Sequence, residues 1–418
     1  MAAHSSRIGA SVRTRYILTH PNVYLVKDIC RPVRVAVLTE IISPYRIPVF
    51  NELASDPRID LEVLFFAESE ERRRWRVPWE KIRFKSSILP GMLVAHRYQD
   101  GPMFLNPTII AALWRGKYQT IICFGYHHPT IWLALLWSRW SRKRSLLWSE
   151  STRRDTRSSS GVVEILKRQI IQCFTGFVAA GTAQVEYLRD LGAAQKDIWV
   201  APDAVDSDFF ISQCQVHRKQ KTAIKESLGV KGLIVLYVGR LLDAKGIPDL
   251  IEAFEHVVKH QHATLMLVGD GPDMERYKAM CRERGLTSVH FAGFRPQEEL
   301  PQYYGIADVF VFPTRSDPWG LVLNEAMCAG LPVICSTAAG AAIDLVRTGH
   351  NGLLQEPGDI EAIVRHLSIL LSDDKLRHRM GANSREIIAA FSPERMAQGL
   401  SEAVLNMQHQ GYANIQNE

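Results

Sequence analysis

Several features that identify common classes of protein are absent from this 418-residue sequence. Its seven cysteines include no Cys-x-x-Cys pair and no Cys/His spacing of the kind found in zinc sites. Because they are odd in number and lie mostly in apolar surroundings, we expect reduced core cysteines in a cytosolic protein. No run reaches the roughly 18 uninterrupted apolar residues of a membrane-spanning helix.

The first 32 residues contain several Arg and Ser but one acid, Asp28. They lack the continuous apolar core and the small-residue cleavage site of a secretory signal peptide. We therefore predict that residues 1–32 are an amino-terminal extension, disordered or misassigned, ahead of the folded chain.

Charge is distributed unevenly along the chain, although the net charge is only +6. Residues 1–180 carry 27 Lys and Arg against 14 Asp and Glu, a net of +13, whereas the remainder carries 23 against 30, a net of −7. A basic and an acidic half are expected to face different partners. Basic charge alone would allow nucleic-acid binding, but no recognition motif supports it, so we predict no nucleic-acid partner.

From residue 33 onward, apolar strand-like runs alternate with helical segments. The predicted strands of the first half are residues 33–39, 61–67, 120–125, 145–150 and 176–181. Those of the second half are residues 233–239, 264–272, 289–294, 309–314, 331–336 and 351–357. Such alternation is typical of parallel sheets covered by helices, and the length of the chain favours two domains.

We place the link between the halves where "APDAVDSDFF" is followed by the polar "SQCQVHRKQKTAIKES", residues 201–227. The predicted fold class is α/β, with two Rossmann-like, doubly wound domains over residues 33–203 and 204–391 and a final helical segment over 392–418. Ligands of such sheets bind beyond the carboxyl ends of strands, so binding and catalytic residues are expected in the strand-end loops.

The first candidate loop is "VGRLLDAKG" (residues 238–246), in which a predicted strand ends at Gly239. Arg240 and Lys245 lie between this strand and the next helix. Two cations beside a helix amino terminus form a good anion site, because the helix dipole, free backbone N–H groups and side-chain charges add together. Two solvated surface cations are the alternative.

A second loop, "RSDPWGLVLNEAMCAGLPVI" (315–334), places Asp317 and Glu325 eight residues apart. We expect Asp317 to cap a helix that ends at Gly330, which explains this acid without a ligand. Glu325 lies in an otherwise apolar helix, so its carboxylate requires a partner or an opening. A carboxylate there is suited to accept hydrogen bonds from the two vicinal hydroxyls of a ribose.

Two glycine turns, "GDGP" (269–272) and "GFRP" (293–296), each follow a predicted strand. At neighbouring strand ends they would shape a slot for a flat base. Most such turns only lead into a helix, which is the alternative.

In combination, these motifs resemble family 4 of the retaining, two-domain nucleotide-sugar glycosyltransferases. The resemblance runs from about residue 176 to 395 and is traceable, more weakly, from residue 33. It rests on the "GR…KG" loop, "GDGP", the strand end at "GFRP" and the Asp317–Glu325 block. The segments "DAVDSDFF" and "GHNGLLQEPGD" match as well.

The resemblance implies a role for each matching residue. Arg240 and Lys245, beside Gly239, would hold the diphosphate of the nucleotide sugar and stabilise the leaving nucleotide. Glu325 would bind the ribose hydroxyls. Asp317 would occupy the first position of the family's pair of acids and contact the transferred sugar.

The backbone at Gly320 and Leu321 would add contacts to that sugar, and Phe294 and Arg295 would lie at the base. The first acid of the pair is usually Glu in the family. Here it is Asp317, one methylene shorter, which would alter reach or sugar preference.

The first domain departs further from the family. Many members have a His at the end of the strand where this chain has Glu150, and His127 in "GYHHP" matches another family histidine position less specifically. We treat both as catalytic candidates, and a buried, hydrogen-bonded structural residue is the alternative for each. Tyr45 and Arg46, where many members have a Gly-Gly loop, are candidates for the acceptor side, although Arg46 could equally be a solvated helix residue.

Two segments of the basic half interleave Trp with Arg and Lys, namely "RRRWRVPW" (72–79) and "WLALLWSRWSRKR" (132–144). This pattern suits an anionic membrane surface or a lipid-phosphate acceptor. A core helix with a solvated basic end is the alternative for the second segment.

The family resemblance implies the GT-B fold, two domains facing across a cleft with the last helix returning to the first domain. It also implies transfer of a sugar from a nucleoside-diphosphate-sugar (UDP or GDP) to a hydroxyl acceptor, with retention of anomeric configuration, in polysaccharide, glycolipid or glycoconjugate biosynthesis. We expect no cofactor and no metal, because Arg240, Lys245 and helix dipoles would neutralise the diphosphate.

We further expect a cytoplasmic protein, peripheral on the inner face of the cell membrane, with an acceptor that is lipid-linked. Two alternatives stay open from the sequence. One is a sugar-nucleotide epimerase of the same fold, which would convert the nucleotide sugar without an acceptor. The other is a catalytically inactive nucleotide-sugar-binding protein, for which Glu150 and Asp317 would be the inactivating replacements.

Overall fold

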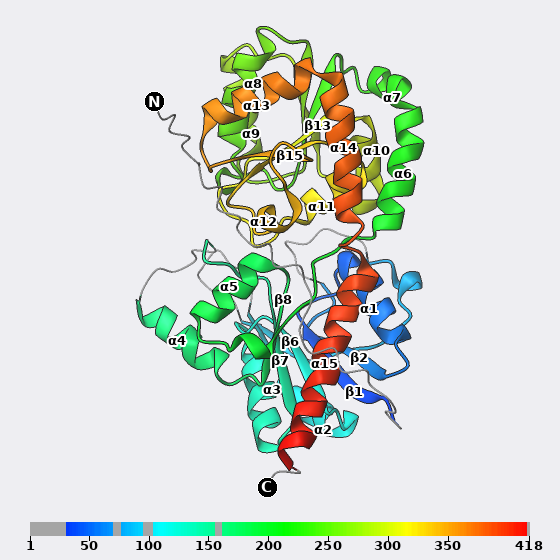
Figure 1. The fold of residues 1–418 in the computed structure, drawn as a ribbon, viewed down its shortest axis with the longest axis vertical. Coiled ribbons are helices and arrows are strands. Elements are labelled where there is room, and N and C mark those ends of the chain that lie inside the picture. Colours follow the sequence, from blue (N-terminus) through cyan, green and yellow to red (C-terminus); the bar gives the residue numbers. More distant parts are fainter. Residues whose placement is uncertain (1–30, 70–76, 95–102, 155–160, 416–418) are drawn as a thin grey trace, which may run out of the picture. The chain divides into compact units, whose positions relative to one another are not determined.

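Two parallel β-sheets, each covered by helices, make up the chain, as the alternating pattern predicted (Figure 1). This computed structural model describes residues 31–69, 77–94, 103–154 and 161–415. The predicted amino-terminal extension, except its last two residues, and most of the basic segment at residues 72–79 lie outside the described residues.

Buried apolar runs form the first sheet, whose order is β3-β2-β1-β6-β7-β8-β9 and whose neighbouring pairs are all parallel. Its strands are β1 (Val33–Thr39), β2 (Ile59–Phe65), β3 (Lys85–Ile88), β6 (Thr120–Phe124), β7 (Arg144–Ser149), β8 (Gly176–Ala179) and β9 (Ile198–Val200). A separate antiparallel pair consists of β4 (Met92–Val94) and β5 (Met103–Leu105).

The second sheet has the order β12-β11-β10-β13-β14-β15, again with parallel pairs throughout. Its strands are β10 (Leu233–Val238), β11 (Ala263–Val268), β12 (Val289–Gly293), β13 (Val309–Phe312), β14 (Val333–Ser336) and β15 (Gly352–Gln355). Because β10 lies between β11 and β13, the loops that follow these three strands emerge at one edge of the sheet.

Helices follow most strands, as expected for doubly wound domains. Those of the first domain are α1 (Ile47–Ser55), α2 (Ile109–Gly116), α3 (Pro129–Trp140), α4 (Gly161–Ile171) and α5 (Thr182–Asp190). Those that follow are α6 (Ser207–Lys219), α7 (Lys221–Ser227), α8 (Ile247–Val258), α9 (Met274–Glu283), α10 (Leu300–Ile306), α11 (Leu321–Cys328), α12 (Ala342–Leu345), α13 (Ile360–Ser372), α14 (Asp374–Ile388) and α15 (Pro393–Ile415).

Most of the strands predicted from the sequence are buried, and the exposed or very short strands were missed. The central strands are almost fully buried, for example β10 and β11, so they read as continuous apolar runs. Strand β3 is exposed along its whole length and has the sequence Lys-Ser-Ser-Ile, which carries no such signal. It was missed, as were the three-residue strands β4, β5 and β9.

The linker prediction is wrong for its polar part, residues 212–227, which lies in helices α6 and α7. Helix α6 begins at Ser207 because the side chain of Asp206 accepts a hydrogen bond from the N–H of Phe209 at 3.1 Å. Phe210 and Cys214 of this helix are buried in the core of the second domain. The high polarity of the remaining residues hid this apolar face. The boundary between residues 203 and 204 stays a prediction.

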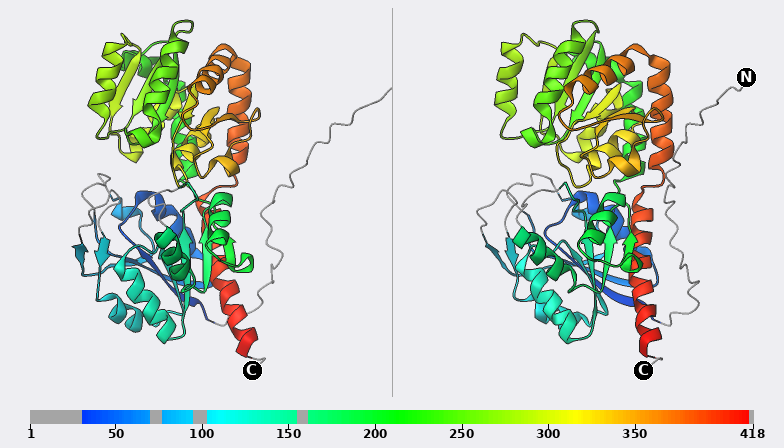
Figure 2. Two further views of the ribbon diagram at one scale, coloured as in Figure 1. Left: turned by 90° about the vertical axis from the view of Figure 1, so that its left-hand side faces the viewer. Right: turned by 60° about the vertical axis from the view of Figure 1, so that its left-hand side comes forward.

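The last helix, α15, packs against α1, β8 and β9 of the first domain (Figure 2). The side chain of Gln408 donates a hydrogen bond to the hydroxyl of Thr120 at 2.8 Å. The end of the chain therefore contributes to the core of the domain with which it begins. Within the described residues, no helix is both long and apolar enough to cross a bilayer.

Gly269 follows β11 in the second sheet, where the backbone after β11 closely approaches the backbone after β10. A Cβ atom there would lie 1.9 Å from the carbonyl oxygen of Gly239, and the backbone has φ +141°. We expect Gly269→Ala to lower the free energy of unfolding by about 1–3 kcal/mol or more, because strain and overlap both apply. Chemical denaturation measures this change. Gly285→Ala is the matched control, because Gly285 has φ +66° and open space around it. Equal losses in the two variants would contradict the close approach.

Candidate functional site

Glycine residues at three neighbouring strand ends build one edge of the second sheet. The N–H of Gly239, after β10, donates to the carbonyl of Val268 at 3.0 Å. The N–H of Gly269, after β11, donates to the carbonyl of Gly293 at the end of β12, at 2.9 Å. The three motifs that the sequence singled out separately therefore lie side by side, as the interpretation of "GDGP" and "GFRP" required.

The loop after β13 joins this edge through backbone hydrogen bonds. The N–H of Arg315 donates to the carbonyl of Ala244 at 2.9 Å, which ties this loop to the one after β10. As a result, Nζ of Lys245 lies 2.6 Å from Oδ2 of Asp317 and also donates to the carbonyl of Ser316 at 3.1 Å. Two residues predicted from separate motifs thus form one ion pair.

Arg240 has a different environment from Lys245. Its side chain is exposed, and it has no ion-pair partner among the residues that the structure describes. The backbone there is fixed, because the hydroxyl of Tyr237 donates to the carbonyl of Arg240 at 3.0 Å. Helix α8 begins two residues after Lys245, so its amino terminus adds partial positive charge to the same loop. This arrangement can bind an anion.

The prediction that Asp317 caps the following helix is wrong. Helix α11 begins at Leu321, and its N-cap residue is Gly320, with φ +96°. Oδ1 of Asp317 instead accepts a hydrogen bond from the N–H of Trp319 at 3.2 Å, within the turn that precedes the helix. The predicted end of the helix is confirmed, because Gly330 follows its last turn with φ +72°.

Glu325 is completely buried on α11. Its Oε2 accepts a hydrogen bond from the hydroxyl of Tyr304 at 2.6 Å. Burial raises the pKa of Glu325 from 4.5 to about 7, although hydrogen bonds from Tyr304 and Tyr45 oppose the rise. The partner that the sequence required is therefore a pair of tyrosines. Tyr45 belongs to the first domain, in the short 3-10 helix Pro44–Arg46.

Phe294 and Arg295 lie beyond β12, at the outer side of this edge. The ring of Phe294 is 45% exposed. The guanidinium of Arg295 is held by the carbonyl of Ala292 and by Glu299, at 3.1 and 3.2 Å. An exposed ring beside a fixed guanidinium is suited to contact a planar group.

The facing edge of the first sheet carries a cluster of Arg46, Glu150 and Asp203, in which Asp203 is buried and the other two side chains are partly exposed. The guanidinium of Arg46 pairs with both carboxylates. Burial raises the pKa of Glu150 to about 8, and the charges of Asp203 and Asp317 add to the rise against the opposing charge of Arg46. Asp317 is thus close enough to influence Glu150. Asp203 was missed because nothing in "APDAV" distinguishes it from a turn acid.

Arg46 is held by this cluster and is not a solvated helix residue, which removes the alternative raised for it from the sequence. Its side chain is 11% exposed, and it lies over the rings of Phe124 and Trp148 at 5.6 and 4.9 Å. The charges of Asp203 and Glu150 raise the pKa of Arg46 despite burial. Tyr45, next to it, reaches the second domain.

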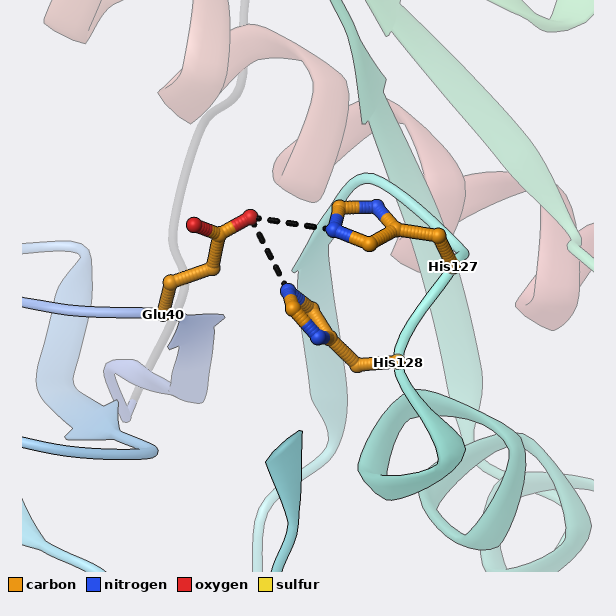
Figure 3. Close-up of side chains that lie close together, drawn as sticks. All are labelled: Glu40, His127 and His128. Atoms are coloured by element: carbon orange, nitrogen blue, oxygen red, sulfur yellow. Dashed lines mark ion pairs between the residues drawn. The ribbon is translucent and has the colours of Figure 1, made fainter. Parts of the chain in front are cut away.

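His127 follows β6 and lies with His128 around Glu40, which follows the neighbouring strand β1 (Figure 3). The two Nε2 atoms lie 3.2 and 2.9 Å from the same oxygen, Oε1 of Glu40. Burial would raise the pKa of Glu40, but hydrogen bonds and charge from both histidines hold it well below its usual range. Glu40 carries no signal in the sequence beyond its position after a strand.

These three residues are grouped closely enough to be considered as metal ligands. Nδ1 of His128, however, accepts a hydrogen bond from the N–H of Phe104 at 3.2 Å. A neutral imidazole whose Nδ1 accepts must carry its proton on Nε2, and that nitrogen then has no lone pair for a metal. His128 is therefore unsuited as a ligand in this arrangement, and Glu40 with His127 alone would make a poor site.

Direct hydrogen bonds connect the two domains around Asp317 and the start of α5. The side-chain amide of Gln184 donates to the carbonyl of Pro318 at 2.6 Å. The N–H of Thr182 donates to Asp344 of α12 at 2.9 Å. Burial raises the pKa of Asp344, and the hydrogen bonds that it accepts from the N–H and the hydroxyl of Thr182 oppose the rise.

Comparison with known proteins gives a family match for the second domain. Residues 219–387 match the family model described as Glycosyl transferases group 1. Sulfoquinovosyl transferase SQD2 of Arabidopsis thaliana is 34% identical over 214 residues, which are 50% of this chain and 38% of the relative. D-inositol 3-phosphate glycosyltransferase of Xylanimonas cellulosilytica is 29% identical over 55% of this chain and 57% of the relative. The chain spans about half the length of these relatives.

Solved structures match along both domains. Anabaena HepE in complex with UDP and glucose has a TM-score of 0.69 at 19% identity, over 89% of this chain and 99% of that one. Sucrose-phosphate synthase from Thermosynechococcus elongatus has a TM-score of 0.68 at 20% identity, over 91% and 100%. The expected two-domain GT-B fold and the resemblance to glycosyltransferases of this group are confirmed.

The raised pKa of Glu325 predicts a pH-dependent stability. The folded protein keeps a proton on this carboxyl up to a pH of about 7, whereas the unfolded chain loses it near 4.5. The contribution of Glu325 to stability therefore falls as pH rises from about 4.5 to 7, by about 3 kcal/mol. In Glu325→Gln this fall should be absent.

Urea unfolding of wild type and Glu325→Gln across this pH range measures the difference in the free energy of unfolding. Glu361→Gln is the control, because the side chain of Glu361 is 91% exposed. Parallel pH curves for wild type and Glu325→Gln would show that the carboxylate is not buried in this way.

Proposed function

We propose, from the premise that residues 219–387 form a glycosyl transferases group 1 domain, that this protein moves a sugar from a nucleoside-diphosphate sugar to a hydroxyl acceptor. The observation that carries the proposal is the convergence of Arg240, Lys245 and Asp317 at one edge of the second sheet. Lys245 and Asp317 are paired at 2.6 Å there, and Arg240 is exposed.

The diphosphate would bind between Arg240, Lys245 and the amino terminus of α8. These positive groups are fixed before the reaction, so they stabilise the charge that develops on the departing diphosphate without reorganisation. The same role in other enzymes falls to a divalent cation, and the residues present here supply the charge without one. We therefore propose a metal-independent reaction with no cofactor.

The Lys245–Asp317 ion pair suggests how the sugar is held. When a phosphate oxygen takes the ammonium of Lys245, the carboxylate of Asp317 loses its partner at 2.6 Å. The freed oxygen can then accept a hydrogen bond from a sugar hydroxyl. Binding of the diphosphate and of the sugar would thus be coupled through one carboxylate.

Glu325 would take the ribose hydroxyls, but Tyr45 and Tyr304 hydrogen-bond to it in this structure. A bound ribose would replace the hydroxyl of Tyr45. Because Tyr45 belongs to the first domain, the nucleotide site is expected to respond to movement between the domains. The exposed ring of Phe294 and the guanidinium of Arg295 are suited to contact the base.

A retaining reaction fits the arrangement of these groups. The acceptor hydroxyl would attack from the side of the departing diphosphate, and the diphosphate oxygen would take the hydroxyl proton as the new glycosidic bond forms. Positioning and charge stabilisation then supply most of the catalysis. Glu150 and His127, at neighbouring strand ends of the first sheet, are suited to the acceptor side. The retaining mechanism is the one implied by the resemblance to family 4.

Transfer to a glycoconjugate or polysaccharide acceptor is favoured over the epimerase alternative. The two relatives described above are named as transferases, and neither is an epimerase. An inactive nucleotide-sugar-binding protein would need the same cations to hold the diphosphate, so only conversion of the nucleotide sugar separates it from a transferase. UDP is the nucleotide in the HepE complex, which makes a UDP-sugar the first candidate to test.

A face of the first domain supports an anionic membrane as the place of action. Trp132, Leu136 and Trp140 share one side of α3, at intervals of four residues, and are 44%, 65% and 79% exposed. Trp114 of α2, half exposed, contacts the ring of Trp140 at a centroid distance of 6.0 Å. The surrounding exposed cations are Arg115, Lys117, Arg139 and Arg142.

This face reconciles the two interpretations of segment 132–144. Ile131, Ala134 and Trp137 of the same helix are buried, so α3 does pack on the core. The tryptophans on its other side remain exposed beside positive charge, which is the combination that inserts into the headgroup region of anionic lipid. We propose peripheral attachment there, with a lipid-linked acceptor.

Substitution of the cations tests the proposed reaction. We expect Arg240→Ala and Lys245→Ala each to lower kcat/KM for the nucleotide sugar by about 10²-fold or more, because each removes preorganised charge from the departing diphosphate. Arg365→Ala is the control, because Arg365 is an exposed cation on α13. The assay measures loss of UDP-sugar with and without a membrane extract as acceptor source.

The same assay separates the three functions. Transfer requires the acceptor and gives a product of greater mass, and added chelator leaves the rate unchanged. Conversion of the nucleotide sugar without acceptor would identify an epimerase, and binding without any conversion would identify an inactive protein. Unchanged transfer in both Ala variants would show that the diphosphate binds elsewhere.

Vesicle binding tests the membrane face. We expect Leu136→Ser with Trp140→Ser to reduce binding to anionic vesicles by about 10-fold or more, because two apolar side chains no longer enter the bilayer interface. Co-sedimentation with anionic and zwitterionic vesicles measures it. Ile369→Ser, at an exposed apolar residue on α13, is the control. Equal binding by all three proteins would rule out this face.

A further inference from the structure

Glu40 lies at the edge of the first sheet where the acceptor is expected, yet it has no part in the function described so far. Strands β1, β6 and β7 are neighbours in that sheet, and Glu40, His127 and Glu150 each follow one of them. Glu150 in turn is influenced by the charge of Asp317. The three residues therefore form a row that leads toward the proposed sugar site.

The environment of His128 determines where its proton lies. The ring is fully buried and packs against Phe66 and Phe104, with ring centroids 5.4 Å away in each case. Because its Nδ1 accepts the N–H of Phe104, the neutral ring carries its proton on Nε2, 2.9 Å from Glu40. His128 thereby donates a hydrogen bond to the carboxylate of Glu40 and has a structural role.

His127 has the same contact but a different exposure. Its Nε2 lies 3.2 Å from the same oxygen of Glu40, and its side chain is half exposed. An ionised carboxylate can only accept hydrogen bonds, so it favours the form of His127 with the proton on Nε2. Figure 3 shows the other ring nitrogen, Nδ1, turned away from Glu40. No described residue hydrogen-bonds to that Nδ1.

We infer that Glu40 is a positioning residue that holds the proton of His127 on Nε2 and so presents the Nδ1 lone pair to the acceptor hydroxyl. The inference rests on the proposed function and adds to it a residue on the acceptor side. His127 accepts a hydrogen bond from this hydroxyl as the acceptor binds, which places the attacking oxygen. As the glycosidic bond forms, that hydrogen bond breaks and the hydroxyl proton passes to the departing diphosphate, so the reaction needs no further base.

Glu40 can orient His127 because its two histidine partners differ in burial. His128 is rigid and inaccessible, which fixes the position of Oε1 of Glu40. Oε1 in turn fixes the orientation of the more exposed His127, whose ring lies with its centroid 3.8 Å from that of His128. A histidine positioned in this way loses little conformational freedom when the acceptor binds.

The protonation state can be measured without an activity assay. Long-range ¹H–¹⁵N correlation spectra of the ¹⁵N-histidine-labelled full chain distinguish the two neutral forms, and His127→Asn identifies the signals of His127. We expect a proton on Nε2 of His127 in wild type and in Glu40→Gln, whose amide oxygen can still accept. In Glu40→Leu we expect a mixture of both forms. A proton on Nδ1 in wild type, or the same form in Glu40→Leu, would overturn the inference.

A double-mutant cycle tests whether the effect reaches the reaction. We expect Glu40→Leu to lower kcat/KM for the acceptor by about 10-fold to 100-fold, with KM for the nucleotide sugar unchanged and Glu40→Gln largely active. In the His127→Ala background, Glu40→Leu should have little further effect, because it acts through that ring. Glu80→Ala, at an exposed acid of the same domain, is the control.

The outcomes separate this inference from the proposed function. Equal losses from Glu40→Leu with and without His127 would show a purely structural role and overturn the inference. An absence of transfer in wild type, with the expected histidine spectra, would reject the proposed reaction while retaining the positioning of His127. Urea unfolding of Glu40→Leu, in which Nε2 of buried His128 loses its partner, separates loss of fold from loss of alignment.

Discussion

Parallel pairing of the strands is the constraint on which the rest of this structure depends. Because neighbouring strands run in the same direction, the loops that follow them emerge at one edge of each sheet. In the second domain this edge holds Arg240, Lys245 and Asp317, although the first and last are 77 positions apart by their numbers. In the first domain it holds Glu40, His127 and Glu150. No single motif contains a complete site, and each site exists only through the order of the strands.

Burial then determines how the acids at these edges behave. Glu325 has a raised pKa because it is completely buried, and the pKa of Glu150 is raised by partial burial and by the charges of Asp203 and Asp317. Glu40 instead has a lowered pKa because two histidines surround it. The same chemical group thus serves in three ways, as a carboxyl hydrogen-bonded to tyrosines, as part of an arginine cluster and as a support for imidazoles. Such differences arise from neighbours contributed by distant segments.

Much of the fold follows from local patterns in the sequence. Buried central strands need apolar runs, and turns at their ends need glycine, so β10 and β11 and the motifs after them were predicted. Polar or very short elements were missed, because β3 is exposed and the buried face of α6 is hidden among charged residues. Asp317 was misassigned as a helix cap, since its partner Lys245 comes from another loop and only the folded chain brings them together.

The sequence by itself determined the two-domain α/β architecture, the loop that carries Arg240 and Lys245, and the group of glycosyltransferases that the chain resembles, because these depend on residue types at fixed short spacings. Only the tertiary structure decided that Tyr45 of the first domain reaches Glu325, that Arg46 pairs with Glu150 and Asp203, and that Glu40 faces His127 and His128. These contacts join residues from different strands, and their distances and protonation depend on packing in three dimensions.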